Sequence, residues 1–336
     1  MSELEEIEDW STVVGQDKLV QNLKNALHYQ KISHAYMIQG EKLSGKRMLA
    51  NIFARALQCE SDSIKPCNQC RSCKQAINQN HPDIIYVEHD KPNVISVDNI
   101  RLQINGDIAI KPYSGKHKIY IVDEAEKMNQ QAMNALLKTL EEPPEYAVIM
   151  LLTTSQDVML PTIISRCVVM NTKPVSRQLI TNYLMMKKHI PDYRANVCAN
   201  FARGNIGRAI ELASNEEFDQ MKAKSIGILA RIFDTEINEF STTVKKMLED
   251  KVNIEDFLDL CMIWYRDVLL MKSTKNRSLL VFTEYTLDLQ RIASKYTYEA
   301  IERITKAIEH TRSRIHYNVN EELSLEVLFF EMQKPE

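Results

Sequence analysis

The 336-residue sequence lacks any run of eighteen apolar residues, and it lacks a basic, apolar leader at its start. The first ten residues, MSELEEIEDW, are acidic, so we expect no membrane span and no signal peptide, and we predict a cytoplasmic protein. The sequence also lacks a strong excess of one charge, since its formal net charge is −3. A surface that is basic throughout is thereby excluded, and contact with DNA would need a local basic stripe or partner subunits.

Glycine and proline are scarce, with eight and ten residues respectively. Together with 44% hydrophobic and 26% charged residues, this composition excludes a disordered or fibrous chain and is typical of a globular one. The length exceeds one ordinary hydrophobic core, so two or three domains are expected.

Cysteine is the residue whose distribution is informative. Four of the seven cysteines follow the pattern Cys59-x7-Cys67-x2-Cys70-x2-Cys73, which supplies enough thiolates for a tetrahedral zinc site. An iron–sulfur cluster is the weaker interpretation, because no Cys-Pro follows the run. A full shell of sulfur leaves no open position, so the zinc would be structural, either as a staple, which we favour, or as a knob for a partner. The other three cysteines lie far apart: Cys167, Cys198 and Cys261.

The first half of the chain alternates strand and helix patterns. A helical stripe over 16–30 precedes a short apolar strand, HAYMIQG at 34–40, and a glycine-bearing loop then leads into a second helical pattern that ends at Cys59. KIYIV at 118–122 and AVIMLLT at 147–153 are further apolar strands, separated by a helical segment that ends at Pro143. This order predicts an α/β domain over residues 1–172, with the zinc module inserted at 59–73.

The second half carries helical spacing only, for example in FDQMKAKSIGILARIF and SLEVLFFEMQ. The change of period after Lys173-Pro174 predicts that the α/β domain ends there. A polar SNEE stretch suggests a further break near 215, which gives a small all-α domain over 173–215 and an all-α domain over 216–336.

The loop after the first strand, Gly40-Glu-Lys-Leu-Ser-Gly45-Lys46-Arg47, fits the glycine and lysine positions of a phosphate loop. Its glycines let backbone N–H groups surround phosphates, and Lys46 could reach the terminal ones. Arg47 stands where Ser or Thr normally ligates Mg²⁺, so phosphate-loop ancestry is predicted while productive Mg–ATP binding is uncertain. The plainer alternative is a strand–helix turn with a surface lysine.

Asp123 and Glu124 follow the apolar strand KIYIV. An aspartate there could hold Mg²⁺ through water, and the glutamate could polarise an attacking water. Acids at a helix N-terminus are the plainer alternative, and the combination with Lys46 favours the nucleotide site. Arg166, in the polar break Ser165-Arg166-Cys167, is by sequence alone more simply a surface arginine.

Several motifs, taken together, resemble the clamp-loader AAA+ family of DNA polymerase III over most of residues 11–212: VVGQ, HAYMIQG, the four cysteines, KIYIVDEAEKM, NALLKTLEEPP, the threonine pair ending at Thr154, and LPTIISRC. The resemblance implies an AAA+ domain, a helical lid and a helical collar that joins five subunits in a ring. A helicase is disfavoured because the all-α second half leaves no second α/β domain.

Within that family, gamma/tau ATPase subunits have an intact phosphate loop, whereas delta-prime subunits often have a degraded loop yet keep the zinc module and the SRC motif. Arg47 favours the delta-prime kind, and a gamma/tau-like ATPase that hydrolyses ATP itself is the alternative. The resemblance makes Arg166 an arginine finger for a neighbour's ATP and puts Arg208 at the nucleotide-sensing position of the lid. It implies gamma/tau and delta subunits, the sliding clamp and primer–template DNA as partners.

Overall fold

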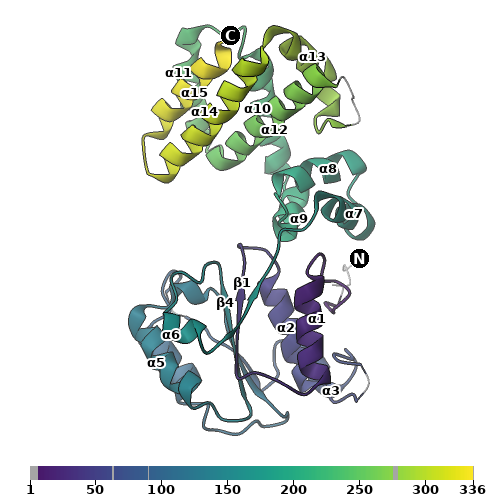
Figure 1. The fold of residues 1–336 in the computed structure, drawn as a ribbon, viewed down its shortest axis with the longest axis vertical. Helices are drawn as coiled ribbons and strands as arrows, with labels where there is room; N and C mark the ends of the chain where they lie inside the picture. Colours follow the sequence, from purple (N-terminus) through teal and green to yellow (C-terminus); the bar gives the residue numbers. More distant parts are fainter. Residues whose placement is uncertain (1–6, 63, 90, 275–278, 336) are drawn as a thin grey trace. The chain divides into compact units, whose positions relative to one another are not determined.

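The computed structural model describes residues 7–335 except 63, 90 and 275–278 (Figure 1). Residues 1–6, on which the prediction of no signal peptide partly rests, lie outside this part. The chain forms two compact units, one of Met1–Leu179 with Gly204–Arg208 and one of Ile180–Arg203 with Ala209–Glu336. The domain limits predicted at 172/173 and 215/216 remain predictions.

A five-stranded parallel sheet forms the centre of the first unit. In the order in which they pair, the strands are β2 (Ile84–Tyr86), β3 (Lys118–Val122), β4 (Ala147–Thr153), β1 (Ala35–Gln39) and β5 (Val168–Asn171). Every residue of β3 and β4 is buried, as a sheet covered on both faces requires. The α/β class predicted for this half is thereby confirmed.

Helices cover the two faces of this sheet (Figure 1). On one face, Tyr36 and Ile38 of β1 pack with α1 (Asp17–His28) and α2 (Lys46–Gln58). On the other, Met37 packs with α5 (Gln130–Glu141) and its neighbours. Alternate residues of one strand thus enter different cores, and each fully buried large apolar side chain contributes about 1.5–3 kcal/mol.

Shorter elements complete the first unit. They are α3 (Arg71–Ile77), α4 (Val97–Ile100), the π-helical turn η1 (Arg101–Asn105), the 3₁₀ turn η2 (Ala125–Lys127) and α6 (Pro161–Ile164). Because the sheet is parallel, the loops after β1, β3 and β4 emerge at the same edge, where a ligand site of an α/β sheet is expected.

After β5 the described residues form helices and no further strand. These are α7 (Arg177–Lys188), α8 (Asp192–Phe201), α9 (Ile206–Ser214), α10 (Glu216–Arg231), α11 (Ile237–Glu249), α12 (Ile254–Ser273), the 3₁₀ turn η4 (Thr283–Tyr285), α13 (Thr286–Lys295), α14 (Tyr298–His316) and α15 (Glu321–Gln333). The helical spacing predicted at 218–233 and 324–333 is confirmed. None of the helices in the described residues combines the length and apolarity that a bilayer crossing needs.

Helix α12 is central in the second unit, where it packs against α10, α13 and α14. Trp264 and Tyr265 are buried on it. The carboxylate of Asp267, also fully buried, accepts hydrogen bonds from the backbone N–H groups of Val281 and Phe282 at 2.7 and 2.9 Å. A buried carboxylate is thus satisfied by main-chain donors and fixes the segment that leads into α13.

Candidate nucleotide pocket and metal centre

Two glycines give the loop between β1 and α2 its shape. Gly45 caps α2 in the left-handed region, with φ of 86°, a conformation that side chains with a Cβ rarely adopt. At Gly40 a Cβ would lie 1.8 Å from Oγ1 of Thr172, so a larger residue there would displace the side chain of Thr172, which follows β5. Glycine is thus required at Gly45 by the backbone conformation and favoured at Gly40 by the close approach of Thr172.

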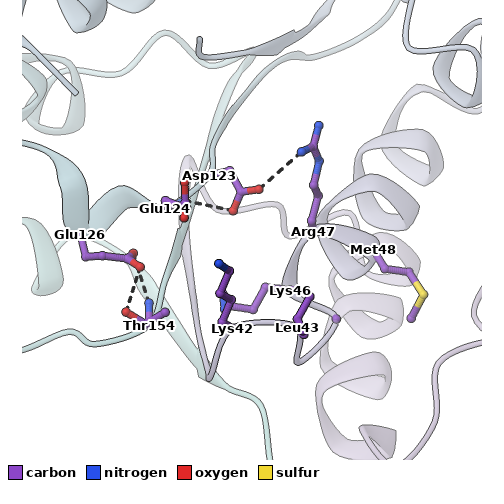
Figure 2. A pocket seen from close by; sticks show the side chains of 10 residues that line it. Lys42, Leu43, Lys46, Arg47, Met48, Asp123, Glu124, Glu126 and Thr154 are labelled. Carbon is purple, nitrogen blue, oxygen red and sulfur yellow. Dashed lines mark hydrogen bonds and ion pairs between the residues drawn. The ribbon is translucent and has the colours of Figure 1, made fainter. Parts of the chain in front are cut away.

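A pocket of about 420 Å³ opens beside this loop at the carboxyl edge of the sheet (Figure 2). It brings together six residues that the sequence singled out: Gly45, Lys46, Arg47, Asp123, Glu124 and Thr154. The other lining residues are Lys42, Leu43, Met48 and Glu126. The sequence motifs of three separate loops thus converge on one cavity.

Lys46 is 9% exposed and points back onto the loop. Its Nζ donates hydrogen bonds to the carbonyl oxygens of Gly40 and Glu41, both at 2.7 Å. Burial lowers the pKa of Lys46, and the carboxylates of the pocket oppose that effect, Glu126 most strongly. The ammonium is therefore held by neutral oxygens inside an acidic surrounding.

Arg47 lines the pocket from α2, and its guanidinium faces Asp123, the residue after β3 (Figure 2). Its Nη1 lies 3.7 Å from Oδ2 of Asp123, and its guanidinium carbon lies 5.6 Å from the centre of the Tyr86 ring. A phosphate loop would hold Mg²⁺ through the Asp123 carboxylate and a hydroxyl at position 47. Here the Arg47 guanidinium pairs with that carboxylate, and the hydroxyl is absent because residue 47 is arginine. The residues present do not fit a magnesium ion bound in the manner of a phosphate loop.

The remaining acids of the pocket are also engaged. Glu124 pairs with Lys127, with 2.5 Å between Oε2 and Nζ. Glu126 accepts hydrogen bonds from the backbone N–H and the hydroxyl of Thr154, at 3.2 and 2.8 Å. Burial raises the pKa of Glu126, but the hydrogen bonds that it accepts lower the pKa by more, so the pKa lies below its usual value. Sequence reasoning missed Glu126 and Lys127, although both belong to the charged run that follows β3.

Arg208 lies in the segment Gly204–Arg208, which packs against the phosphate loop. Asn205 ties the two together, because its Nδ2 donates to the carbonyl of Lys42 at 2.7 Å while its Oδ1 accepts the backbone N–H of Arg208 at 3.1 Å. A Cβ on Gly207 would lie 2.2 Å from the carbonyl oxygen of Leu43. The sequence placed Arg208 near nucleotide, and the segment that carries it does touch the loop, but Arg208 does not line the pocket.

Arg166 does not line the pocket and is the second residue after α6. Its Nη2 pairs with Oε1 of Glu141 at 3.0 Å, and its Nη1 donates to the carbonyl of Thr162 at 3.0 Å. The side chain is 35% exposed, so its guanidinium is accessible from solvent while its direction is fixed by α5 and α6.

The four predicted cysteines form one cluster. The sulfur atoms of Cys59, Cys67, Cys70 and Cys73 all lie within 4.8 Å of one another, and those of Cys67 and Cys73 are 3.9 Å apart. A tetrahedral site with Zn–S bonds of about 2.3 Å places its sulfurs about 3.8 Å apart, so the set fits a metal ion of this kind.

Backbone N–H groups point at the sulfurs of this cluster. Those of Cys67, Cys70 and Cys73 each lie 3.4 Å from the sulfur of another member. Such donors favour the thiolate, and the backbone N–H groups of Gln69 and Cys70 lower the pKa of Cys67 to about 6. Burial instead raises the pKa of Cys59 and of Cys73, and a bound cation would offset that effect.

Three contacts attach the cysteine module to the α/β core. Helix α3 packs on α2, and the indole N–H of Trp10 donates to the carbonyl of Lys65 at 2.8 Å. The Oγ of Ser72 lies 2.9 Å from Nε2 of His81, whose Nδ1 accepts the backbone N–H of Asp83 at 3.1 Å. The module has little apolar content, and it is thus attached by the packing of one helix and by two polar contacts.

Two family models match this chain. The family described as DNA polymerase III, delta subunit, matches residues 15–176, and the family described as DNA polymerase III, delta subunit, C terminal, matches residues 235–334. The delta' subunit of DNA polymerase III from Bacillus subtilis is 28% identical over 323 residues, which are 95% of this chain and 96% of that protein. This chain belongs to the DNA polymerase III clamp-loader family.

Other members of the clamp-loader family match less of their own length. The DNA polymerase III tau subunit of Bacillus subtilis is 31% identical over 283 residues, and the chain spans 50% of that protein. Among solved structures, a DNA polymerase III gamma subunit-related protein from Thermotoga maritima is 21% identical, with a TM-score of 0.46 over 93% of this chain and 99% of that one.

Proposed function

We propose that this clamp-loader subunit is of the delta-prime kind: it does not hydrolyse ATP and instead supplies Arg166 to the ATP site of a neighbouring gamma/tau subunit. The observation that carries the proposal is the ion pair between Arg47 and Asp123, inside a pocket lined by residues that we predicted to bind nucleotide. The match to a delta' subunit over nearly the full length of both chains supports the same assignment.

Hydrolysis in the chain's own pocket lacks two requirements. A magnesium ion has no hydroxyl ligand at Arg47, and it would have to displace the Arg47 guanidinium from Asp123. Glu124, the residue placed to polarise water, is paired with Lys127. Since phosphoryl transfer depends on the metal and on a positioned nucleophile, we expect turnover by this chain to be negligible.

Arg166 suits a role in trans because it is accessible and already directed. Its contacts with Glu141 and Thr162 engage Nη2 and Nη1 and leave further N–H donors of the guanidinium for a phosphate. An arginine finger stabilises the charge that develops on the transferred phosphoryl group and raises the rate by roughly 10³- to 10⁵-fold. An exposed ion pair contributes little to stability, so stability alone does not account for an arginine at this position.

The remaining parts of the proposal follow the family resemblance. Residues 173–215 would form the lid, with Arg208 as its nucleotide-sensing residue, and residues 216–336 the collar that holds the subunit in a ring with gamma/tau and delta subunits. The ring would load the sliding clamp onto primer–template DNA. The four-cysteine site would hold zinc as a structural staple, since four thiolates leave no open coordination position.

The alternative, a gamma/tau-like subunit that hydrolyses ATP itself, needs Arg47 to leave the loop functional. One experiment separates the two. ATP turnover with Mg²⁺ is measured for the chain alone, and then with gamma/tau and delta subunits and primed DNA, for the native chain and for Arg166→Ala.

We expect no turnover by the chain alone, DNA-stimulated turnover in the complex, and a fall of roughly a thousandfold or more at the adjacent ATP site with Arg166→Ala. Zinc content and the unfolding midpoint of the variant should match those of the native chain. Steady turnover by the chain alone would establish the alternative, and an unchanged rate with Arg166→Ala would remove the role in trans.

A further inference from the structure

The pocket beside the phosphate loop does not fit a magnesium ion, yet it has a volume of about 420 Å³ and three cationic side chains, Lys42, Lys46 and Arg47, beside its three carboxylates. We propose that it binds the polyphosphate of a nucleotide without a divalent cation, with the Arg47 guanidinium in the place of the metal. This goes beyond the proposed function, which requires no ligand in this pocket, and it assigns Arg47 a binding role rather than a merely disabling one.

The charge on Lys46 is the first step. The side chain is 9% exposed, and its two hydrogen-bond partners are the neutral carbonyl oxygens of Gly40 and Glu41. Within the part of the chain that the structure describes, no carboxylate forms an ion pair with it. A buried ammonium without a paired anion carries a desolvation cost that a bound anion would offset.

Among the described residues, no acid of the pocket forms an ion pair with that lysine, although Glu126, Asp123 and Glu124 act on its charge from a greater distance. Asp123 is paired with Arg47, Glu124 with Lys127, and Glu126 accepts two hydrogen bonds from Thr154. Each carboxylate thus has a partner of its own while Lys46 keeps a net positive charge beside the cavity. The pocket volume of about 420 Å³ is sufficient for a polyphosphate.

The position of Arg47 supports its role as the replacement for the metal. Its side chain is 55% exposed, and it is held between Asp123 and the ring of Tyr86 at the pocket entrance. Figure 2 shows its guanidinium facing the carboxylate of Asp123, with which it forms the ion pair. A guanidinium has five N–H donors and can bind a phosphate with one edge while another edge stays on a carboxylate.

The same geometry sets the expected effect of magnesium. A divalent cation on the nucleotide would be repelled by Arg47, would find Asp123 already paired, and would find no hydroxyl at position 47. Added Mg²⁺ should therefore leave the affinity unchanged or weaken it. In an intact phosphate loop, where a hydroxyl ligates the ion, the metal contributes to binding instead.

The test is calorimetric titration of the full-length chain with ATP, in excess EDTA and in excess Mg²⁺. We expect the native chain to bind ATP in EDTA and to bind it no more tightly in Mg²⁺. Arg47→Thr supplies the missing hydroxyl, so its binding in EDTA should be roughly ten- to a hundredfold weaker than native, and Mg²⁺ should restore it. Lys46→Ala should weaken binding in both solutions, and Arg101→Thr, an exposed arginine of the same unit, should weaken it in neither.

Zinc content and thermal unfolding verify that each variant is folded. The proposal is overturned if the native chain binds ATP in neither solution, if it binds only with Mg²⁺, or if Arg47→Thr keeps the native response to the metal. ATP turnover, followed in the same samples, bears on the proposed function alone, because a chain that hydrolyses ATP would contradict that function whatever its affinity in EDTA.

Discussion

The guanidinium of Arg166 and the carboxylate of Glu141 are 3.0 Å apart, although 24 residues separate them along the chain. Glu141 is the last residue of α5, and Arg166 is the second residue after α6. Both side chains are partly exposed, at 35% and 51%, so the pair contributes about 0–1 kcal/mol to stability. Together with the hydrogen bond from Nη1 to the carbonyl of Thr162, its main effect is to fix the direction of the Arg166 guanidinium between α5 and α6.

Replacing Glu141 with glutamine should therefore affect activity more than stability. If Arg166 acts on a neighbouring ATP site, Glu141→Gln should lower DNA-stimulated ATP turnover of the assembled loader by roughly tenfold, within the range that misplacement of a catalytic group causes. The double variant with Arg166→Ala should be no slower than Arg166→Ala alone. Glu142→Gln, at the exposed adjacent position, is the matched control and should keep the native rate. Equal rates for Glu141→Gln and the native chain, with a slow Arg166→Ala, would show that Glu141 does not position the finger.

Much of the site could be predicted from the sequence because its parts are local. The glycines, Lys46 and the acids after β3 each sit at a fixed offset from an apolar strand, and a parallel sheet places the ends of its strands at one edge. The four cysteines are close in sequence, so their meeting in space needed no long-range information. For the same reason, the helices of the second half followed from the spacing of their apolar residues.

The pairings within the site were not predictable in this way. Nothing in the sequence pairs Arg47 with Asp123 or Glu141 with Arg166, because these contacts depend on the rotation of helices and on side-chain directions. The short strands β2 and β5 were also not identified, since three or four residues carry too little periodicity to distinguish a strand from a loop. The π-helical turn at 101–105 has no pattern of its own.

Removing the metal should loosen the cysteine module first. Cys70→Ser, which removes one ligand of the cluster, should lower zinc content from about one ion per chain to a small fraction and should expose the Lys65–Pro66 region to protease, because the module has little apolar core. Metal analysis and limited proteolysis measure both effects. Cys167→Ser is the control, since Cys167 lies in the same unit but outside the cluster. Full zinc content in Cys70→Ser would mean that the cluster is not the metal site.

The Asp83 carboxylate should make the protein less stable as the pH falls into the acid range. Its carboxylate is 1% exposed and accepts backbone N–H groups of Tyr113, Ser114 and Gly115 at 2.6–3.0 Å. Burial raises the pKa of Asp83, but these donors outweigh it and hold the pKa below its usual value. A depressed carboxyl pKa stabilises the fold above the pKa of the unfolded chain, about 3.9, and that stability is lost as the pH falls through the folded value.

Asp83→Asn should thus lower the free energy of unfolding by about 2–3 kcal/mol at pH 7, because the amide cannot accept all of these hydrogen bonds. The difference between variant and native chain should be constant above about pH 5 and shrink below about pH 4. Urea unfolding at several pH values measures it. Asp17→Asn, at an exposed aspartate of α1, should change stability by less than about 1 kcal/mol. A difference that grows as the solution is acidified would contradict this account.

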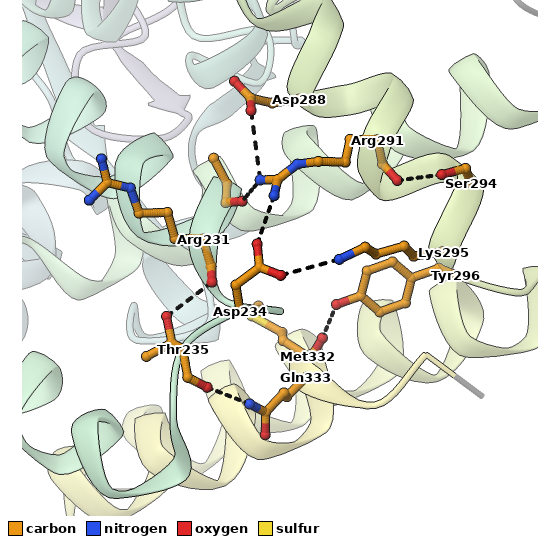
Figure 3. Close-up of polar contacts among 11 residues, drawn as sticks. Arg231, Asp234, Thr235, Asp288, Arg291, Ser294, Lys295, Tyr296, Met332 and Gln333 are labelled. Atoms are coloured by element: carbon orange, nitrogen blue, oxygen red, sulfur yellow. Dashed lines mark hydrogen bonds and ion pairs between the residues drawn. The ribbon is translucent and has the colours of Figure 1, made fainter.

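The helical unit offers a comparison between a buried hydroxyl and a surface ion pair (Figure 3). Tyr296 is 1% exposed and donates a hydrogen bond to the carbonyl of Met332 on α15, and burial raises its pKa to about 12. Asp234 instead pairs at the surface with Arg291 and Lys295, at 2.7 and 3.2 Å, and these partners lower its pKa.

Tyr296→Phe should destabilise this unit by about 1–2 kcal/mol, because it leaves a buried carbonyl without its donor. Asp234→Asn should cost clearly less, and its effect should vanish at high salt, since exposed pairs are screened. The fluorescence of buried Trp264 during urea unfolding, in a Trp10→Phe background, reports this unit alone. A larger loss for Asp234→Asn than for Tyr296→Phe would mean that the surface network around Asp234, rather than the packed contact between Tyr296 and α15, holds the last helix in place.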